Sequence, residues 1–302
     1  MENGIFLSYF FLIFGIFPNS LTGYKILLQP HIIENLLIPS KLHLLSFLPT
    51  SNFGYDISRM TEAALMAQDT GADIVDINSG CPAPKVVRKG GGCNLMREPE
   101  HFRKLLTAMR QVVRTPLTVK IRSGWDENTK NALEIAKIVE GEGADALAIH
   151  GRARTQMYRG DADWNLVGEV ANAIKIPVLG SGDVTDRASA DKRFRLGISG
   201  LMIGRGALQN PFVFNDILSG SRTEISKNPE LALSILSRYR DLLLEDFSPN
   251  GAIGKLKQLA SQMCRGLQWR REFCMAGSLE EMETIIMKTR ESLQQNSALL
   301  AA

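Results

Sequence analysis

The chain has 302 residues, 44% of them hydrophobic, and carries a net charge of +3. This length suits one large domain, or one with a small addition, and the mildly basic charge permits nucleic-acid binding without requiring it. The four cysteines lack the paired spacing of a zinc site and do not form the framework of a disulfide-rich protein, which indicates a reducing, cytoplasmic setting. They are Cys81, Cys93, Cys264 and Cys274.

An apolar segment, Ile5 to Phe17, lies near the N-terminus. It is short for a membrane span, no Lys or Arg precedes it, and no clean small-residue cleavage site follows it. A signal peptide or anchor is the alternative, but we expect a buried or misassigned segment and no membrane association. The rest of residues 1–52 shows no sustained period, although Tyr24 to Leu28 and Leu42 to Leu48 are candidate strands.

From Asp56 onward, helices and short apolar strands alternate regularly. Asp56 or Ser58 is expected to cap a helix that runs to about Asp69, and Asn128 or Thr129 to cap a later one. Further helices are predicted to start at Pro99, Trp164 and Arg187. Five strands are predicted from the sequence, starting near residues 74, 117, 146, 177 and 201.

Polar side chains follow each of these strands, at the point where the strand ends. Such groups can converge on one ligand only if the strands curl around it, because the outer strands of an open sheet lie too far apart. The sequence therefore predicts an α/β fold, a (β/α)8 TIM barrel that is irregular or incomplete at its N-terminus, with a doubly wound sheet as the alternative. The polar groups are Cys81, Lys120, Arg122, His150, Arg152, Asp183 and Arg205.

The sequence changes character after about Leu218, where amphipathic helices are predicted at 228–247 and 278–296. Residues 254–271, between them, contain basic side chains and no acidic one, which suits a solvated helix face or a phosphate-contacting surface equally well. We predict an atypical apolar segment at 1–52, a catalytic barrel portion at 53–218 and a helical domain at 219–302.

The stretch from Ile74 to Cys93 carries the strongest signal for chemistry. A buried strand breaks at Asn78-Ser79-Gly80, presents Cys81, and is followed by a basic loop that ends in three glycines. A thiol on the loop after a parallel strand lies where α/β proteins place their chemistry. A buried, inert cysteine is the alternative.

Two glycine turns follow the last two legible strands, Gly180-Ser181-Gly182-Asp183 and Gly204-Arg205-Gly206. Barrels commonly bind phosphate at this place, because backbone N–H groups and a helix N-terminus point toward the anion. The two turns together predict a phosphate site.

The motif Asn78-Ser79-Gly80-Cys81-Pro82, followed by the basic run Lys85 to Gly92, resembles the signature of the tRNA-dihydrouridine synthases. These are flavoenzymes that reduce selected uridines in tRNA. The resemblance covers residues 53–218 well, the C-terminal third weakly and the first fifty residues not at all. The Pro-Met-Ala-Gly flavin loop and the later Gln of the family are missing there, and we hypothesise that a shifted reading frame or a wrong start replaced them.

The resemblance implies FMN as cofactor, NADPH as reductant and tRNA as partner, in a monomer without metal. Hydride would pass from FMN to C6 of a uridine drawn out of the RNA stack, and Cys81 would protonate C5 as general acid. Residues implied to bind the cofactor are Lys120, His150, Ser181, Gly182, Asp183, Gly204 and Arg205. Residues expected to contact substrate or RNA are Asn78, Lys85, Arg88, Lys89, Arg122, Arg152, Lys255, Lys257 and Arg265. For Arg122 and Arg152, contact with the flavin phosphate is the alternative.

Two other functions remain open on the sequence. Another FMN barrel oxidoreductase would act on a small molecule and would not need the basic C-terminal region. A catalytically impaired paralogue would bind RNA without reducing it, as the missing flavin loop and Gln suggest.

Overall fold

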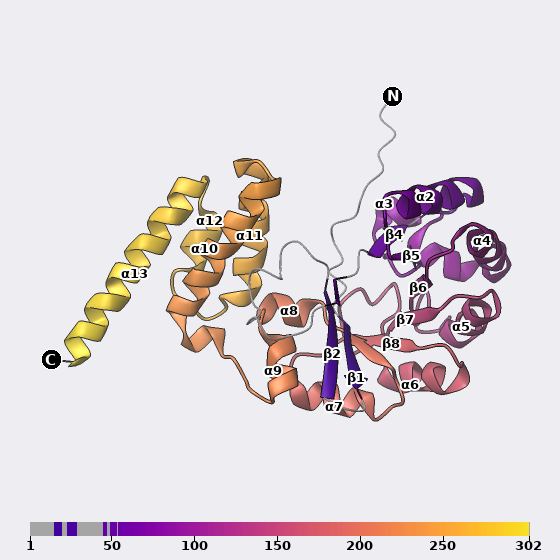
Figure 1. The fold of residues 1–302 in the computed structure, drawn as a ribbon. Coiled ribbons are helices and arrows are strands. Elements are labelled where there is room, and N and C mark those ends of the chain that lie inside the picture. The colour runs from indigo at the N-terminus through magenta and orange to yellow at the C-terminus, as the bar shows by residue number, and fades with distance from the viewer. Residues whose placement is uncertain (1–14, 20–22, 29–44, 47–48, 53, 302) are drawn as a thin grey trace. The chain divides into compact units, whose positions relative to one another are not determined.

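The structure is a computed structural model, which describes residues 15–19, 23–28, 45–46, 49–52 and 54–301, with side chains for Asn52 and for residues 54–296. The described residues up to Gly204 form one compact unit, and those from Arg205 onward form a second. This boundary lies before the expected one at 218, because Leu208 and Phe212 pack against the apolar core of the second unit. Figure 1 shows the elements of both units.

The first unit is built on one sheet of nine strands in the order β3-β2-β1-β9-β8-β7-β6-β5-β4. The pairs from β4 to β9 are all parallel. These six strands are β4 (Pro49–Asn52), β5 (Ile74–Asn78), β6 (Leu117–Arg122), β7 (Ala146–His150), β8 (Val178–Ser181) and β9 (Gly200–Met202).

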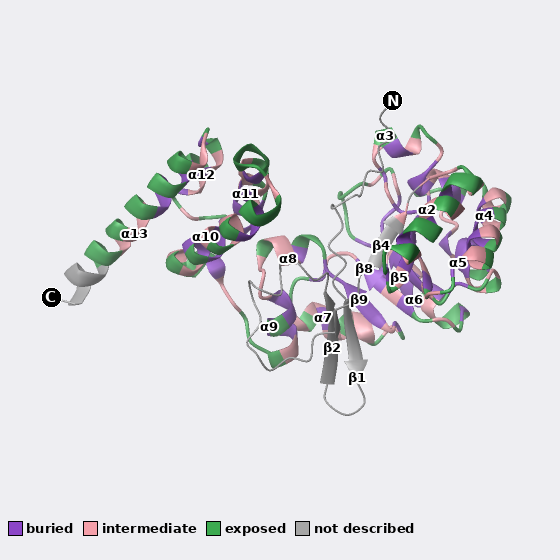
Figure 2. Cartoon of the chain, turned by 45° about the horizontal axis from the view of Figure 1, so that its top comes forward, coloured by how far each residue is buried: buried purple, intermediate pink, exposed green. Residues whose placement is uncertain are grey.

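Helices follow these parallel strands along the chain and cover the sheet, with their polar faces exposed in Figure 2. Their buried side chains pack toward strand residues that are fully buried, such as Ile77, Ile121 and Leu147. This is the α/β pattern predicted from the alternation of elements. The helices are α2 (Ile57–Asp69), α3 (Pro84–Val87), α4 (Pro99–Val112), α5 (Ala132–Gly141), α6 (Trp164–Ala173) and α7 (Arg187–Phe194), with a 3-10 turn, η1 (Gly92–Arg97).

Short strands before residue 47 extend the sheet beyond β9 and differ from regular barrel units. β1 (Gly15–Asn19) pairs antiparallel with both β2 (Gly23–Leu28) and β9, and β2 pairs in parallel with β3 (Leu45–Ser46). A connection as short as residues 20–22 joins only antiparallel strands, since parallel neighbours need a crossover of a dozen residues or more. The predicted irregularity at the N-terminus therefore takes the form of a hairpin.

One predicted helix cap is wrong. Asn131, and neither Asn128 nor Thr129, is the residue that precedes α5. The Oδ1 atom of Asp126 accepts hydrogen bonds from the backbone N–H groups of Asn128 and Thr129 and from the Thr129 hydroxyl. These bonds form a separate turn that contains Asn128 and Thr129, so the helix begins after both of them.

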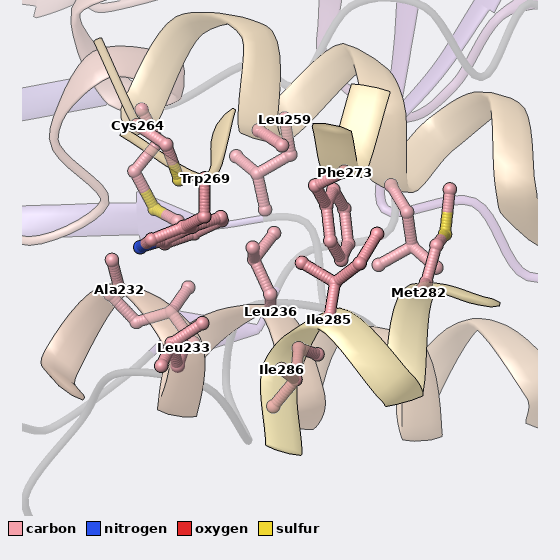
Figure 3. Packing of buried hydrophobic residues seen from close by; sticks show 14 of the residues in the cluster. Ala232, Leu233, Leu236, Leu259, Cys264, Trp269, Phe273, Met282, Ile285 and Ile286 are labelled. Carbon is pink, nitrogen blue, oxygen red and sulfur yellow. The ribbon is translucent and has the colours of Figure 1, made fainter. Parts of the chain in front are cut away.

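The second unit is helical, as predicted. A cluster of buried apolar residues from four of its helices forms the core, with Phe273 packed edge-on against Trp269 at a centroid distance of 6.0 Å. Figure 3 shows Leu236, Phe273, Met282 and Ile285 meeting in this cluster. The elements are α8 (Arg205–Gln209), α9 (Val213–Ser219), η2 (Ile225–Lys227), α10 (Pro229–Asp246), α11 (Pro249–Met263), α12 (Arg270–Met275) and α13 (Leu279–Ala301).

Within the described part of the chain, no helix has the length and apolar character needed to cross a membrane. No group of three or more His, Cys, Asp or Glu side chains among these residues is arranged to hold a metal ion. Most of the apolar run from Ile5 to Phe17 lies outside the described residues.

Candidate functional site

The face of the sheet opposite the helices carries the polar residues. Residues paired across neighbouring parallel strands point to the same face, and successive residues of one strand point to opposite faces. The pairings Asn78–Lys120, Arg122–His150 and His150–Ser181 therefore place these five side chains on one face, near the carboxyl ends of β5 to β8. The sheet thus brings Lys120, Arg122 and His150, three of the polar groups predicted to converge, to one face. Arg205, another of them, belongs to the second unit.

The loop after β5 holds Cys81, which is partly exposed, against the glycine run that follows it. The backbone N–H of Cys93 donates to the carbonyl oxygen of Cys81 at 3.1 Å. Gly92 has a φ of +60°, and a Cβ atom there would lie 2.5 Å from the Cys81 carbonyl oxygen. Glycine is therefore required at position 92 for the two parts of this loop to meet.

A second thiol, Cys93, is completely buried beside this loop, and burial raises its pKa to about 12. A thiol with such a pKa stays protonated and unreactive near neutral pH. The environment of Cys93 is that of a packing residue. Cys81 is the more exposed of the two.

Lys120 lies on the polar face and is only 8% exposed. Burial, together with the smaller effect of the neighbouring Arg122 charge, lowers its pKa to about 8, whereas the charge of Asp76 opposes the shift. Such a lysine is close to equally charged and neutral in mildly alkaline solution. A ligand with negative charge at this position would favour the charged form.

Arg122 is 3% exposed and connects two loops through backbone carbonyl groups. Its Nε donates to the carbonyl oxygen of Gly80 at 3.0 Å, and its Nη1 donates to those of Ala153 and Met157 at 3.2 and 3.1 Å. The same guanidinium therefore holds the residue before Cys81 and the loop after β7. These bonds favour a positioning role over the predicted direct contact with RNA.

Arg152 is 2% exposed and pairs with Asp183, whose two carboxylate oxygens accept from its Nη2 at 2.8 and 2.7 Å. Its Nη1 is buried and has no hydrogen-bond partner among the described residues. A Cβ atom on Gly182, which has a φ of +124°, would lie 3.8 Å from this Nη1. A buried cationic donor without an acceptor beside a glycine turn is an arrangement that suits an anion.

His150 and Trp164 flank the same turn. The Nδ1 atom of His150 lies 3.2 Å from the backbone nitrogen of Arg152, so it accepts from that N–H, and Nε2 is the ring nitrogen that carries the proton in the neutral imidazole. The indole N–H of Trp164 donates to the carbonyl oxygen of Gly182 at 3.1 Å. Trp164 therefore holds the turn at its Gly182 carbonyl group, and His150 holds the backbone at Arg152.

A model of the family described as dihydrouridine synthase matches residues 53–297. The chain belongs to the dihydrouridine synthase family. A probable tRNA-dihydrouridine synthase of Rickettsia conorii is 36% identical over 224 residues, which are 73% of this chain and 68% of the relative. The tRNA-dihydrouridine synthase B of Pseudomonas putida is 42% identical over 171 residues, 56% of this chain and 51% of the relative.

A solved structure of a mandelate oxidase mutant with a monooxide FMN adduct aligns with a TM-score of 0.39 and 17% identity, over 65% of this chain and 57% of that one. A score this low does not establish a common fold. The match to the dihydrouridine synthase family rests on the sequence, and it spans both compact units.

Other predicted site residues of this family member lie in three different places in the structure. Lys85, on α3, and Arg88 and Lys89, directly after this helix, are exposed, so solvent and a large substrate can reach them. Asn78 is buried, and its Oδ1 accepts from the backbone N–H of Gly80 at 3.1 Å, which shapes the turn before Cys81. The third group belongs to the second unit: Arg205, Lys255, Lys257 and Arg265.

The basic residues predicted in the second unit are accessible to different extents. Arg265 is exposed, and its Nη2 donates to the side chain of Gln262 at 2.6 Å. Lys255 and Lys257 are half-buried on α11, and the ammonium of Lys255 lies 4.6 Å from the ring centroid of Phe247. Their contact with RNA remains a prediction.

Sequence reasoning missed a cluster on the first unit. Arg97 and Arg154 lie over the ring of Trp125, with guanidinium carbons 4.5 and 4.7 Å from its centroid. The three residues come from different loops, separated by at least 28 positions in the sequence. No local pattern could have connected them.

Proposed function

We propose that this chain reduces uridine to 5,6-dihydrouridine in tRNA, with FMN as cofactor and NADPH as reductant. Membership of the dihydrouridine synthase family supports the reaction, and the names of the relatives support tRNA as the substrate. The observation that carries the proposal is that Cys81, Lys120 and the glycine turn at Gly182 lie at one end of the parallel sheet.

The residues on this face of the sheet fit FMN. Its phosphate would accept from the buried Nη1 of Arg152 and lie against the turn formed by Ser181, Gly182 and Asp183. The ammonium of Lys120 and the imidazole of His150 would line the flavin ring. When bound there, FMN supplies the hydride for the reduction, and a cation near the ring favours its negatively charged reduced form.

Cys81 would supply the proton. Its partly exposed Sγ follows the polar face of the sheet, so a uracil ring drawn into the site would present C5 to the thiol. A thiol can hold a proton near neutral pH and release it to a carbon that gains electron density. Arg122 holds the carbonyl group of Gly80, which fixes the loop that carries this thiol.

Cys81→Ala tests the proposal directly. The purified chain is loaded with FMN, desalted, and incubated with NADPH and tRNA that lacks dihydrouridine, and the product is measured by mass spectrometry of digested tRNA. We expect the variant to keep its flavin absorbance and to lose at least about a hundredfold in rate, the size typical of a general acid.

Cys93→Ala is the matched control, since this buried thiol has no proposed part in the reaction. It should retain activity within a few fold. A wild-type chain that binds FMN but leaves tRNA unchanged would contradict the reaction. A wild-type chain that retains no FMN would contradict the cofactor site.

A further inference from the structure

Three successive loops of the first unit meet in the cluster of Arg97, Trp125 and Arg154, which we call the arginine–tryptophan stack. Arg97 ends η1 after β5, Trp125 follows β6, and Arg154 follows β7. Each guanidinium lies within cation–π distance of the same indole ring. The stack therefore holds two positive charges close together at the carboxyl end of the sheet.

Backbone hydrogen bonds fix the geometry of the stack. The N–H of Arg154 donates to the carbonyl oxygen of Gly124 at 3.0 Å, and the N–H of Thr155 donates to that of Trp125 at 3.0 Å. The loop is also held by Arg122, which bonds to the carbonyl of Ala153. The charges are thus preorganised, and little conformational entropy remains to be lost when a ligand binds.

The charge of the stack is not neutralised by an ion pair among the described residues, where neither guanidinium contacts a carboxylate within salt-bridge distance. The charge of Asp126 interacts with that of Arg97, but the Asp126 carboxylate accepts hydrogen bonds within its own turn. The Nε atom of Arg154 is buried and has no hydrogen-bond partner in the part of the chain that is described. An anion would satisfy both the charge and this donor.

The stack lies beside the site that contains Cys81. The guanidinium of Arg122 bonds both to Gly80, the residue before Cys81, and to Ala153, the residue before Arg154. Arg154 is also close enough to Cys93 for its charge to act on the pKa of that thiol. A polymer whose reacting nucleotide enters at Cys81 would therefore pass over the stack.

We propose that the arginine–tryptophan stack binds phosphate groups of the RNA strand next to the nucleotide that enters at Cys81. This inference rests on the proposed function. The ring of Trp125 is engaged by two guanidinium groups, so the stack offers N–H edges and positive charge rather than an open aromatic face for a base. The phosphodiester backbone is the part of RNA that matches such a surface.

The test is tRNA binding by the full-length chain, loaded with FMN, over a series of salt concentrations. Each phosphate contact contributes about 0.7 to 0.9 to the slope of log K against log salt concentration. Arg97→Gln and Arg154→Gln should each reduce the slope by nearly one and weaken binding at low salt several-fold to about tenfold. Retention of FMN and an unchanged circular dichroism spectrum show that the variants are folded.

Two controls distinguish the effect of the positive charges in the stack from the effect of positive charge elsewhere on the protein. Arg59→Gln removes an exposed arginine on α2 and should leave the slope unchanged. Arg97→Lys keeps the positive charge and should keep the slope. Wild-type slopes in both glutamine variants, an equal effect of Arg59→Gln, or a wild-type chain that does not bind tRNA would each overturn the inference.

The proposed function fails on a different measurement. Suppose that the wild-type chain binds tRNA with a salt dependence that requires Arg97 and Arg154 but forms no dihydrouridine. The proposed reaction is then contradicted, and phosphate binding by the stack is supported. If dihydrouridine forms and the slope does not depend on these arginines, phosphate binding by the stack is contradicted and the proposed reaction is supported.

Discussion

Lys120 combines deep burial with a pKa near 8, so its protonation state changes within the range of ordinary buffers. In the unfolded chain a lysine releases its proton only near about pH 10.4. Between these two values the unfolded state binds more protons than the folded state, so the contribution of Lys120 makes the free energy of unfolding increase as pH rises from about 8 to about 10. Below pH 8 the buried charge reduces stability.

We predict that Lys120 of the cofactor-free chain titrates well below every exposed lysine. Reductive methylation with ¹³C-formaldehyde labels the lysines for NMR, and one resonance should shift with a midpoint near pH 8. Lys120→Arg should lack this resonance. A set of lysine resonances that all titrate above about pH 10 would contradict the buried environment of Lys120.

Gly92 is the residue that brings the Cys81 loop and the glycine run together. Gly92→Ala places a Cβ atom 2.5 Å from the Cys81 carbonyl oxygen at a positive φ, so we expect a loss of about 2 kcal/mol or more in the free energy of unfolding, measured in urea. Activity should fall as well, because Cys81 must move.

Gly141→Ala is the matched control for Gly92→Ala. Gly141 is exposed at the end of α5, and no atom lies within 4 Å of the position that its Cβ would take. Alanine there should be neutral or stabilise the chain by up to about 1 kcal/mol. Equal stability of the two variants would show that the loop does not need glycine at position 92.

At the scale of elements, Arg122 joins the loop after β5 to the loop after β7. Arg122→Met would leave the carbonyl groups of Gly80, Ala153 and Met157 without this donor, and we expect a loss of about 2 to 4 kcal/mol in the free energy of unfolding. The exposed Arg114 serves as control, since Arg114→Met should change stability by less than about 0.5 kcal/mol. Two equally stable variants would contradict the bridging role.

The elements also show what sequence could and could not predict. The strands β5 to β9 could be predicted because their helix-facing residues are apolar and because glycine, proline or polar residues lie at their ends. The cap of α5 was wrong because Asp126 forms a competing turn. The positioning role of Arg122 could not be predicted, since its partners are backbone carbonyls up to 42 residues away, which have no sequence signature.

The same limit applies to the candidate site. The thiol loop, the lysine and the glycine turn were found because each lies near or after the carboxyl end of a strand, and these ends meet in a parallel sheet. The arginine–tryptophan stack depends on how three loops bend toward one another. That information is in tertiary packing and not in local spacing.

At the scale of the molecule, the chain consists of two compact units with separate cores. We predict that Phe273→Ala, which removes a ring that is 1% exposed, costs about 3 to 5 kcal/mol within the helical unit. Hydrogen exchange measured by mass spectrometry should increase across α10 to α13 and remain unchanged in β5 to β8. An equal increase in both regions would mean that the units unfold together.

The contact between Arg122 and Met157 has a consequence for natural variation and for engineering. Met157 has a φ of +55° and lies in a loop whose backbone is tied to the thiol loop through one guanidinium. Loops after barrel strands are usually replaced with the aim of changing specificity while the strands and helices keep their structure. Here a transplanted loop that does not reproduce the two carbonyl acceptors would also displace Cys81, the proposed general acid, so a change of this loop would alter the proposed catalytic geometry as well.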